Sequence, residues 1–256
     1  MIDVLSRTVS QAGYTVTYFY KLLAHWNVEE HRVKIGAADD ATQIVLLIPG
    51  LFATGGVMSV LQRWLRRKGL PAFVAETGFY SAISLEKATR IVIEEIRAIR
   101  ERYPHVKRID LVGHSLGGIL AYFAAEAGAL DGLEDSRIVT LGAPFDGTWM
   151  AALSFAAPAV FFTVAPVTPT LIPPLQRRRW RTRAYGARVR LSTLSIAGEL
   201  DVIVPPARCR IEGARNVILA DVDHAGLVLK KRVFWEIHRY LLADIVERKT
   251  IRPLAA

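Results

Sequence analysis

The chain has 256 residues, of which 52% are hydrophobic, and this suits one large domain with a buried core, since α/β folds of this size are commonly single. Cys209 is the only cysteine, which excludes a disulfide framework and a cysteine-based metal site. The formal net charge of +9 is concentrated in basic clusters at residues 63–68 and 177–183. Because neither cluster lies in a recognisable nucleic-acid-binding module, we expect no nucleic-acid partner.

Residues 1–30 carry an amphipathic helical pattern, because apolar residues recur there at alternating spacings of four and three. Such a helix either folds back on the domain or serves as a membrane-surface or dimerisation helix, so the oligomeric state stays open between a monomer and a homodimer. Asp3 and Arg7 interrupt the start, so we recognise no secretory signal and expect a cytoplasmic protein, free or peripheral to the inner face of the membrane. The apolar positions are Leu5, Val9, Ala12, Val16, Phe19 and Leu23.

Short apolar runs alternate with helical patterns along the rest of the chain. The run at 43–48 is continuous in β-branched residues and leucine, as expected of a strand buried on both faces. The alternation predicts an α/β fold with a mostly parallel central sheet and helices on both of its faces. The predicted strands are 33–35 at an edge, 43–48, 71–75, 108–112, 137–141, 191–197 and 216–221. The predicted helices are 57–68, 84–103 with Ser84 as its cap, 119–127 and 227–246.

The pentapeptide Gly113-His114-Ser115-Leu116-Gly117 lies between a predicted strand and a predicted helix. A G-x-S-x-G sequence at a strand-to-helix turn is typical of a nucleophile elbow. The tight turn strains the serine backbone, requires glycine on both sides, and exposes the hydroxyl beside the N–H groups of the following helix. We therefore predict Ser115 as a catalytic nucleophile.

Residues 147–176 contain no charged residue and are rich in Ala, Phe, Val and Pro. One membrane crossing would separate Ser115 from the candidate residues that follow, and two crossings need about 40 apolar residues. Five prolines also interrupt any long helix. We predict an apolar cap or lid at 147–185, inserted into a core of 31–146 and 186–256, with a purely structural insertion as the alternative. Its basic end is a candidate contact for an anionic membrane surface through Arg177, Arg178, Arg179 and Arg181.

A serine nucleophile needs a base to take its proton and a carboxylate to orient that base. In hydrolases with this elbow the chain order is serine, acid, histidine. Asp201 follows the predicted strand at 191–197, and His224 lies in a loop after the strand at 216–221. We predict Asp201 as the orienting acid and His224 as the base.

Other residues compete for both roles. Asp146 and Asp221 are the main alternatives for the acid, and Glu199 is a further one. His238 lies within a helical pattern beside aromatic residues, where packing explains it, and His114 is expected to pack beneath the turn. The remaining histidines lie at helix ends or in loops: His25, His31 and His105.

The oxyanion of an acyl-transfer transition state needs backbone donors. The Leu116 N–H follows the nucleophile and opens a helix, where donors are free. The second donor is expected in the loop after the strand at 43–48, where we assign the Leu51 N–H first and the Phe52 N–H second. A plain strand-to-helix turn is the alternative interpretation of that loop.

These motifs together resemble a bacterial lipase or esterase of the α/β-hydrolase superfamily, over about residues 43 to 245. The resemblance implies ester hydrolysis through an acyl-enzyme intermediate, no metal or organic cofactor, and often a mobile lid. Pro49-Gly50 stands where many of these lipases have His-Gly, and Phe145-Asp146 also departs from their usual residues. The stretches that carry the resemblance are 48–52, 111–118, 141–144, 198–201 and 223–224.

We therefore expect a serine carboxylesterase with lipase-like character, acting on a small-molecule or lipid ester. The apolar cap favours an acyl chain over a polar substrate. An acyltransferase or a thioesterase would use the same residues, and a non-catalytic, membrane-attached binding protein is a further alternative. The expected pocket and lid residues are Phe52, Phe145, Trp149, Phe155, Phe161 and Phe162.

Overall fold

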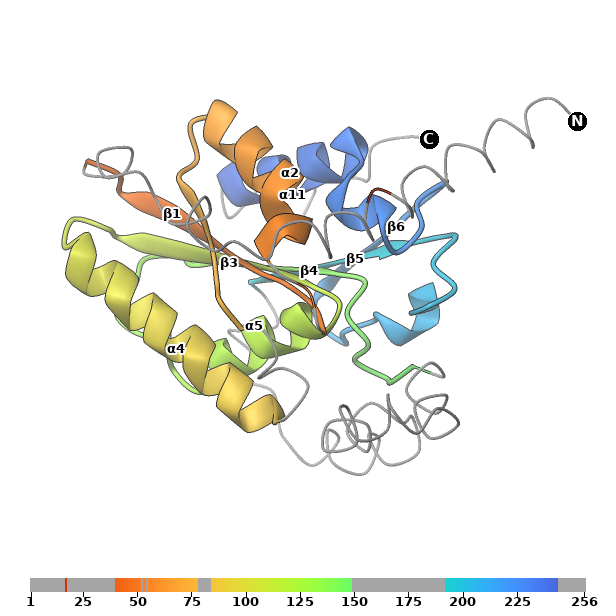
Figure 1. The fold of residues 1–256 in the computed structure, drawn as a ribbon, viewed down its shortest axis with the longest axis horizontal. Coiled ribbons are helices and arrows are strands. Elements are labelled where there is room, and N and C mark those ends of the chain that lie inside the picture. The colour runs from red at the N-terminus through yellow and green to blue at the C-terminus, as the bar shows by residue number, and fades with distance from the viewer. Residues whose placement is uncertain are drawn as a thin grey trace, which may run out of the picture.

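A computed structural model describes residue 17 and residues 40–51, 53, 55–77, 84–148 and 192–243. Its centre is a six-stranded sheet with the strand order β2-β1-β3-β4-β5-β6, in which every pair of neighbours is parallel (Figure 1). The parallel sheet predicted from the alternating pattern is therefore confirmed. The strands are β1 Gln43–Ile48, β2 Ala72–Val74, β3 Arg108–His114, β4 Ile138–Leu141, β5 Thr193–Gly198 and β6 Arg215–Leu219.

Helices cover both faces of the sheet, α2 and α11 on one and α4 and α5 on the other (Figure 1). The predicted cap of α4 is present, because the Lys87 N–H donates to the Ser84 hydroxyl at 3.3 Å. The helices are α2 Gly55–Arg67, α4 Leu85–Arg102, α5 Leu116–Glu126 and α11 Lys231–Leu242, with short 3₁₀ turns η2 Pro206–Arg208 and η3 Gly226–Val228.

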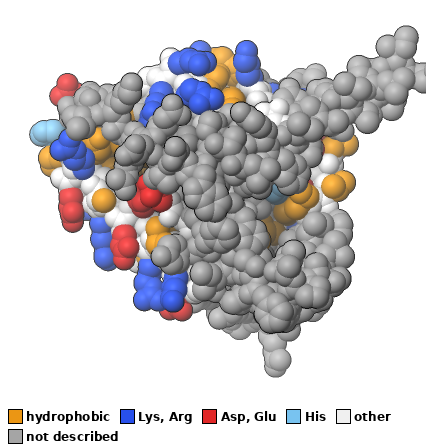
Figure 2. All heavy atoms as spheres, in the orientation of Figure 1, with side chains coloured by type: hydrophobic (Ala, Val, Ile, Leu, Met, Phe, Trp, Pro, Cys, Tyr) orange, Lys and Arg blue, Asp and Glu red, His pale blue; other side chains and the backbone are white. Residues whose placement is uncertain are grey.

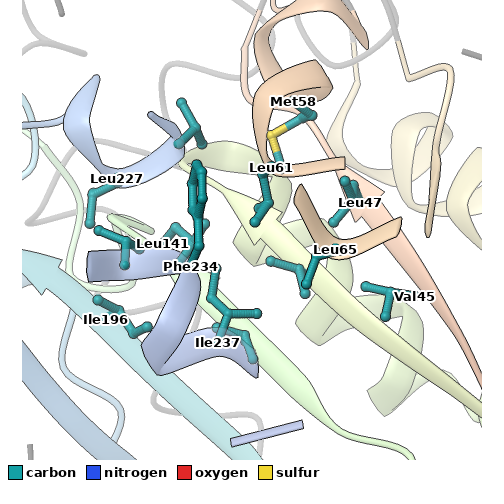
Figure 3. Close-up of a cluster of buried hydrophobic side chains, with 14 of the residues drawn as sticks. Val45, Leu47, Met58, Leu61, Leu65, Leu141, Ile196, Leu227, Phe234 and Ile237 are labelled. Carbon is teal, nitrogen blue, oxygen red and sulfur yellow. The ribbon is translucent and has the colours of Figure 1, made fainter. Parts of the chain in front are cut away.

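Two hydrophobic clusters hold these layers together, one on each face of the sheet. Alternate residues of a strand point to opposite faces, so Val45 and Leu47 join the cluster under α2 and α11, while Ile44 and Leu46 join the cluster under α4 and α5. Figure 3 shows the first cluster, in which Phe234 and its neighbours on α11 meet α2 above the sheet. Strands that bury both faces must be apolar throughout, which explains the uninterrupted run at β1.

The strand order places a topological switch between β1 and β3. From β1 the chain passes through α2 to β2 on one side, and β2 returns through α4 to β3 on the other. In open parallel sheets, ligand sites form beyond the carboxyl ends of the strands at such a point. The residues that follow β1, β3, β4, β5 and β6 all leave the sheet at this edge.

The predicted single helix over 227–246 is wrong in its first turns. The chain forms η3, then adopts an extended conformation at Lys230 (φ −86°, ψ 128°), and only then begins α11. The Lys230 ammonium donates to the carbonyl of Asp221, which ties this break to the loop that carries His224. Apart from residue 17, the predicted N-terminal helix lies outside the described residues, as do the edge strand at 33–35 and the cap from residue 149.

Figure 2 shows Lys and Arg side chains gathered above α2, a helix whose sequence contains no Asp or Glu. Within the described part of the chain, no helix is long and apolar enough to cross a membrane. Nor do the described residues include a group of three His, Cys, Asp or Glu side chains that could hold a metal ion.

Candidate active site

Ser115 lies in the turn that joins β3 to α5. Its backbone has φ 52° and ψ −124°, a left-handed conformation that side-chain-bearing residues rarely adopt. The turn is fixed by the Ser115 N–H, which donates to the carbonyl of Leu141 on the neighbouring strand at 2.8 Å. The serine side chain is partly exposed and makes no hydrogen bond to cap the helix, so its hydroxyl is available for chemistry.

The glycines around Ser115 are needed for close backbone contacts. A Cβ at Gly113 would lie 2.3 Å from the carbonyl oxygen of Gly117, and a Cβ at Gly117 would lie 2.2 Å from the carbonyl oxygen of Ile48. Neither neighbour can move aside, because both are backbone atoms of core elements. The G-x-S-x-G spacing is therefore a steric requirement for packing the start of α5 against β3 and the end of β1.

The loop after β1 lies directly beside the serine, since a Cβ at Gly50 would come within 3.0 Å of the Ser115 Cβ. The loop is a tight turn closed by the Ala53 N–H, which donates to the carbonyl of Gly50 at 3.1 Å. Among the described backbone hydrogen bonds, none uses the Leu51 N–H inside this turn. Leu116 is the first residue of α5, and its N–H has no acceptor within the helix. Phe52 lies outside the described residues.

Asp201 and His224 meet at the same edge of the sheet. Asp201 follows β5 and His224 follows β6, and their side chains are joined by a 2.7 Å contact from His224 Nδ1 to Asp201 Oδ2. Both residues are buried, at 3% and 7% relative exposure. A carboxylate can only accept, so Nδ1 carries the proton, and Nε2 of the neutral ring is left with the lone pair that a general base needs.

The second carboxylate oxygen of Asp201 is held by its own turn. It accepts hydrogen bonds from the N–H groups of Ile203 at 3.0 Å and Val204 at 2.8 Å. These bonds fix the carboxylate so that Oδ2 faces the imidazole. The pair is also tightly covered, because a Cβ at Gly142 would lie 3.1 Å from Asp201 Oδ2 and 3.2 Å from His224 Nδ1.

The competing acids lie elsewhere. Asp146 forms an ion pair with Arg208, Oδ2 to Nη1 at 2.7 Å. Asp221 has a left-handed backbone (φ 56°) before the loop, and Glu199 is exposed. The contact with His224 is therefore made by Asp201, the residue that the sequence favoured.

The other described histidines occupy different surroundings. His238 packs edge-on against Trp64 and Trp235, with ring centroids 5.6 and 5.7 Å away. Burial lowers its pKa, and the nearby Lys68 ammonium lowers it further. His105 is exposed, whereas His25 and His31 lie outside the described residues.

His114 is a site residue whose contact the sequence analysis missed. It is fully buried, as expected for a residue packed beneath the turn, but its Nε2 lies 3.1 Å from the carbonyl oxygen of His224. The two imidazole rings are 4.6 Å apart at their centroids and inclined by 47°. Because 110 residues separate the pair in the sequence, no local pattern could have indicated it.

An apolar cluster borders the serine on the α5 side. Phe145, predicted as a pocket residue, belongs to it and packs edge-on against Tyr122 with ring centroids 5.5 Å apart. The other predicted lid residues (Trp149, Phe155, Phe161 and Phe162) and the basic residues Arg177, Arg178, Arg179 and Arg181 lie outside the described residues. The cluster joins buried Leu116, Ile119 and Ala143 with partly buried Leu51, Leu85, Phe123 and Phe145.

Comparison with known proteins finds similarity to lipases and esterases. The family model of class 3 lipases matches residues 57–165. The mature lipase BlEst2 of Bacillus licheniformis is similar at a TM-score of 0.66 and 16% identity, covering 80% of this chain and 94% of that one. Lipase B of Aspergillus fumigatus is similar at a TM-score of 0.63 and 15% identity, covering 83% and 57%.

A metagenomic carboxyl esterase, MGS0156, is similar at a TM-score of 0.55 and 17% identity, covering 72% of this chain and 65% of that one. Among curated proteins, a non-reducing polyketide synthase of Pseudevernia furfuracea is 31% identical over 109 residues. Those residues are 39% of this chain but only 5% of that protein, so the chain spans a small part of its length. The chain shares the α/β-hydrolase fold of the compared lipases and esterases.

Proposed function

We propose that this chain, which has the α/β-hydrolase fold, is a serine hydrolase of carboxylic esters that works through an acyl-enzyme on Ser115. One observation carries the proposal. The 2.7 Å contact between His224 and Asp201 lies at the carboxyl edge of the sheet, where Ser115 occupies its strained turn. A nucleophile, a base and a group that orients the base are the three parts that this chemistry requires. The class 3 lipase match over residues 57–165 adds support from the sequence.

In the acylation step, Ser115 Oγ attacks the ester carbonyl carbon while its proton passes to His224 Nε2. Asp201 holds the Nδ1 proton and stabilises the imidazolium that forms. When the tetrahedral intermediate collapses, the bond to the alcohol oxygen breaks, and the alcohol leaves with the proton from His224. The acyl group then remains on Ser115.

The negative charge of the tetrahedral intermediate falls on the former carbonyl oxygen. The N–H groups of Leu51 and Leu116 are the proposed donors, because they flank Ser115 and are not used in the turn or helix around them. The positive end of the α5 dipole also favours charge at this point. Losing one such donor typically raises the barrier by about 3–4 kcal/mol.

Water completes the cycle. His224 takes a proton from the water as it attacks the acyl carbonyl, and returns that proton to Ser115 Oγ when the ester bond to the enzyme breaks. If an alcohol or thiol replaced water, the same residues would carry out acyl transfer. The identity of the acceptor therefore separates a hydrolase from a transferase.

The substrate that fits best is an ester with an apolar acyl chain. The side chains of both proposed oxyanion residues belong to one apolar cluster, whose partly buried members include Phe123 and Phe145. An acyl chain placed against this cluster gains about 0.8 kcal/mol for each buried CH₂ group. Catalytic efficiency is therefore expected to rise with acyl length over the first several carbons.

Hydrolysis of p-nitrophenyl esters from acetate to palmitate tests the proposal directly. We expect wild type to hydrolyse them with kcat/KM increasing with chain length, and Ser115→Ala to lose about 10⁴-fold or more. Ser136→Ala is the matched control, because Ser136 accepts from the Ile109 N–H at the opposite edge of the sheet and should leave kcat unchanged. A fluorophosphonate probe should label wild type and the control, but not Ser115→Ala.

Equal rates for wild type and Ser115→Ala would contradict the assignment of the nucleophile. Assays with added alcohols, or with acyl thioesters in place of esters, decide between the related reactions. Product esters formed in preference to free acid would make the chain an acyltransferase, and preferred cleavage of the thioester would make it a thioesterase.

A further inference from the structure

His114 lies between the two loops that flank the nucleophile. On one side its Nε2 is 3.1 Å from the carbonyl oxygen of His224. On the other side it borders the loop after β1, since a Cβ at Gly50 would be 3.6 Å from His114 Nδ1. His114 is itself the last residue of β3, the strand that ends directly before Ser115. One buried ring therefore contacts the loop that carries the proposed base and borders the loop that carries the proposed oxyanion donor.

The chemistry of this contact fixes the state of the His114 ring. A carbonyl oxygen only accepts, so the proton is on Nε2 and that N–H is the donor. Burial holds the pKa of His114 well below its ordinary value, and the neighbouring imidazole of His224 lowers it further. The ring is therefore neutral at neutral pH, and no positive charge at His114 opposes the imidazolium that forms on His224 during acylation.

We propose that His114 is a positioning residue, whose Nε2–H, by donating to the His224 carbonyl, holds the imidazole of His224 in line with Ser115. This inference rests on the proposed function of Ser115, Asp201 and His224. The Asp201 carboxylate fixes only one edge of the base, through Nδ1. The hydrogen bond from His114 fixes the backbone from which the base projects, and the ring contact at 4.6 Å limits its tilt.

The position of His224 depends on such restraints because the residue lies in the loop after β6, outside any helix or strand. The His224 loop is also tied down at Asp223, whose carboxylate accepts from the Gly226 N–H at 2.7 Å, and at Asp221, whose carbonyl accepts from Lys230. Among the described contacts of this loop, the hydrogen bond from His114 is the one that reaches His224 from the strand of the nucleophile. This hydrogen bond therefore links the strand that ends before Ser115, the proton donor, to the loop that carries His224, the proton acceptor. Displacement of a reacting group by about 1 Å can reduce the rate by about 100-fold.

A pair of matched variants separates positioning from packing. His114→Gln retains an N–H donor near the Nε2 position, whereas His114→Met has a similar length and shape but no donor. We expect His114→Gln to keep kcat within about fivefold of wild type and His114→Met to lose about 10- to 100-fold. The KM for a soluble short-chain ester should change less than about twofold in both, because substrate binding does not use this bond.

The midpoint of thermal unfolding, measured for both variants, provides the packing control. A role in packing alone would reduce stability in both variants and leave them with equal kcat, and that result would overturn the inference. If His114→Met does not fold, the His114→Gln variant still tests the inference. A folded His114→Gln variant with kcat reduced more than about 100-fold would overturn it. A wild-type enzyme that neither hydrolyses esters nor reacts with fluorophosphonate would instead refute the proposed function.

Discussion

Gly142 supports the Asp201–His224 pair from the end of β4. Its backbone is left-handed, with φ 60°, and a Cβ there would lie 2.7 Å from Leu227 Cδ1 and close to both polar atoms of the pair. Glycine adopts this conformation without steric cost, whereas other residues are strained by about 1–2 kcal/mol. Glycine is therefore required at position 142 for two reasons, the positive φ and the lack of space for a Cβ.

The substitution Gly142→Ala should reduce both stability and activity. We expect the free energy of unfolding to fall by about 1–3 kcal/mol, and kcat to fall by about 10-fold or more because the added methyl group displaces His224 or Asp201. Urea unfolding and ester hydrolysis measure the two effects. Gly69→Ala is the matched control: Gly69 also has a left-handed φ of 80° but has nothing within 4 Å of its Cβ position. A Gly69→Ala variant that lost kcat as Gly142→Ala does would contradict the role of the contact.

Helix α11 is anchored at its C-terminal end by two arginines, Arg108 at the start of β3 and Arg137 directly before β4. The Arg137 guanidinium donates to the carbonyl of Tyr240 at 2.6 Å and also to that of Leu241, which accepts from Arg108 as well. These carbonyls belong to the last turn of the helix, which has no acceptors of its own further along. Positive charge there also complements the helix dipole. These hydrogen bonds hold α11 in the position where its apolar side, including Phe234, packs against the sheet.

Removing this anchor should destabilise the fold more than removing an exposed arginine. Arg137 is only 3% exposed, so we expect Arg137→Met to lower the free energy of unfolding by about 2–4 kcal/mol, since carbonyl groups of α11 and the Asp135 carboxylate lose a partner. Arg100→Met is the control, because the exposed Arg100 also donates to a carbonyl, that of Asp131, at 3.2 Å. Urea unfolding should show a change below about 0.5 kcal/mol for the control. A loss of equal size in both variants would argue against the anchor.

The elements that carry strong local signals are the ones that the sequence predicts well. The strand predicted at 43–48 is β1 without change of bounds, and the helix predicted over 84–103 begins and ends within one residue of α4. Continuous apolar runs, a serine cap and a proline beyond the helix end are all local. The break before α11 was missed because it depends on Lys230 reaching back to Asp221, a contact that local periodicity does not report.

The same distinction applies to the site. The placement of Ser115, Asp201 and His224 at one edge of the sheet was predictable, because each follows a strand and the strands are parallel. The contacts of His114 and Arg137 were not, since their partners lie 110 and 103 residues away in the chain. Sequence patterns thus predict which residues reach the edge, and packing decides which buried neighbours orient them.

At the scale of the whole molecule, the carboxyl end of the sheet carries the proposed active site, and the amino end carries a buried carboxylate. Strand β3 carries Ser115 just beyond its carboxyl end, and near its amino end it carries Asp110, which is fully buried. The Asp110 carboxylate accepts from Gln43 at 2.7 Å, from Arg108 Nε at 3.1 Å and from the Arg137 N–H at 2.9 Å. Burial is the largest influence and raises the pKa of Asp110 to about 6, against the opposing effect of Arg108 and the other partners.

This raised pKa predicts how stability depends on pH. Between pH 4 and pH 6 the folded chain binds a proton at Asp110 that the unfolded chain has released, so this group's contribution is complete below about pH 4 and is lost as the pH rises through about 6. The loss amounts to about 3 kcal/mol. Urea unfolding at several pH values should show this decline in wild type and in the exposed control Asp131→Asn, but not in Asp110→Asn. Parallel curves for wild type and Asp110→Asn would contradict the prediction. Because Asp110 lies at the edge opposite Ser115, ester hydrolysis in folded Asp110→Asn should keep the wild-type dependence on pH.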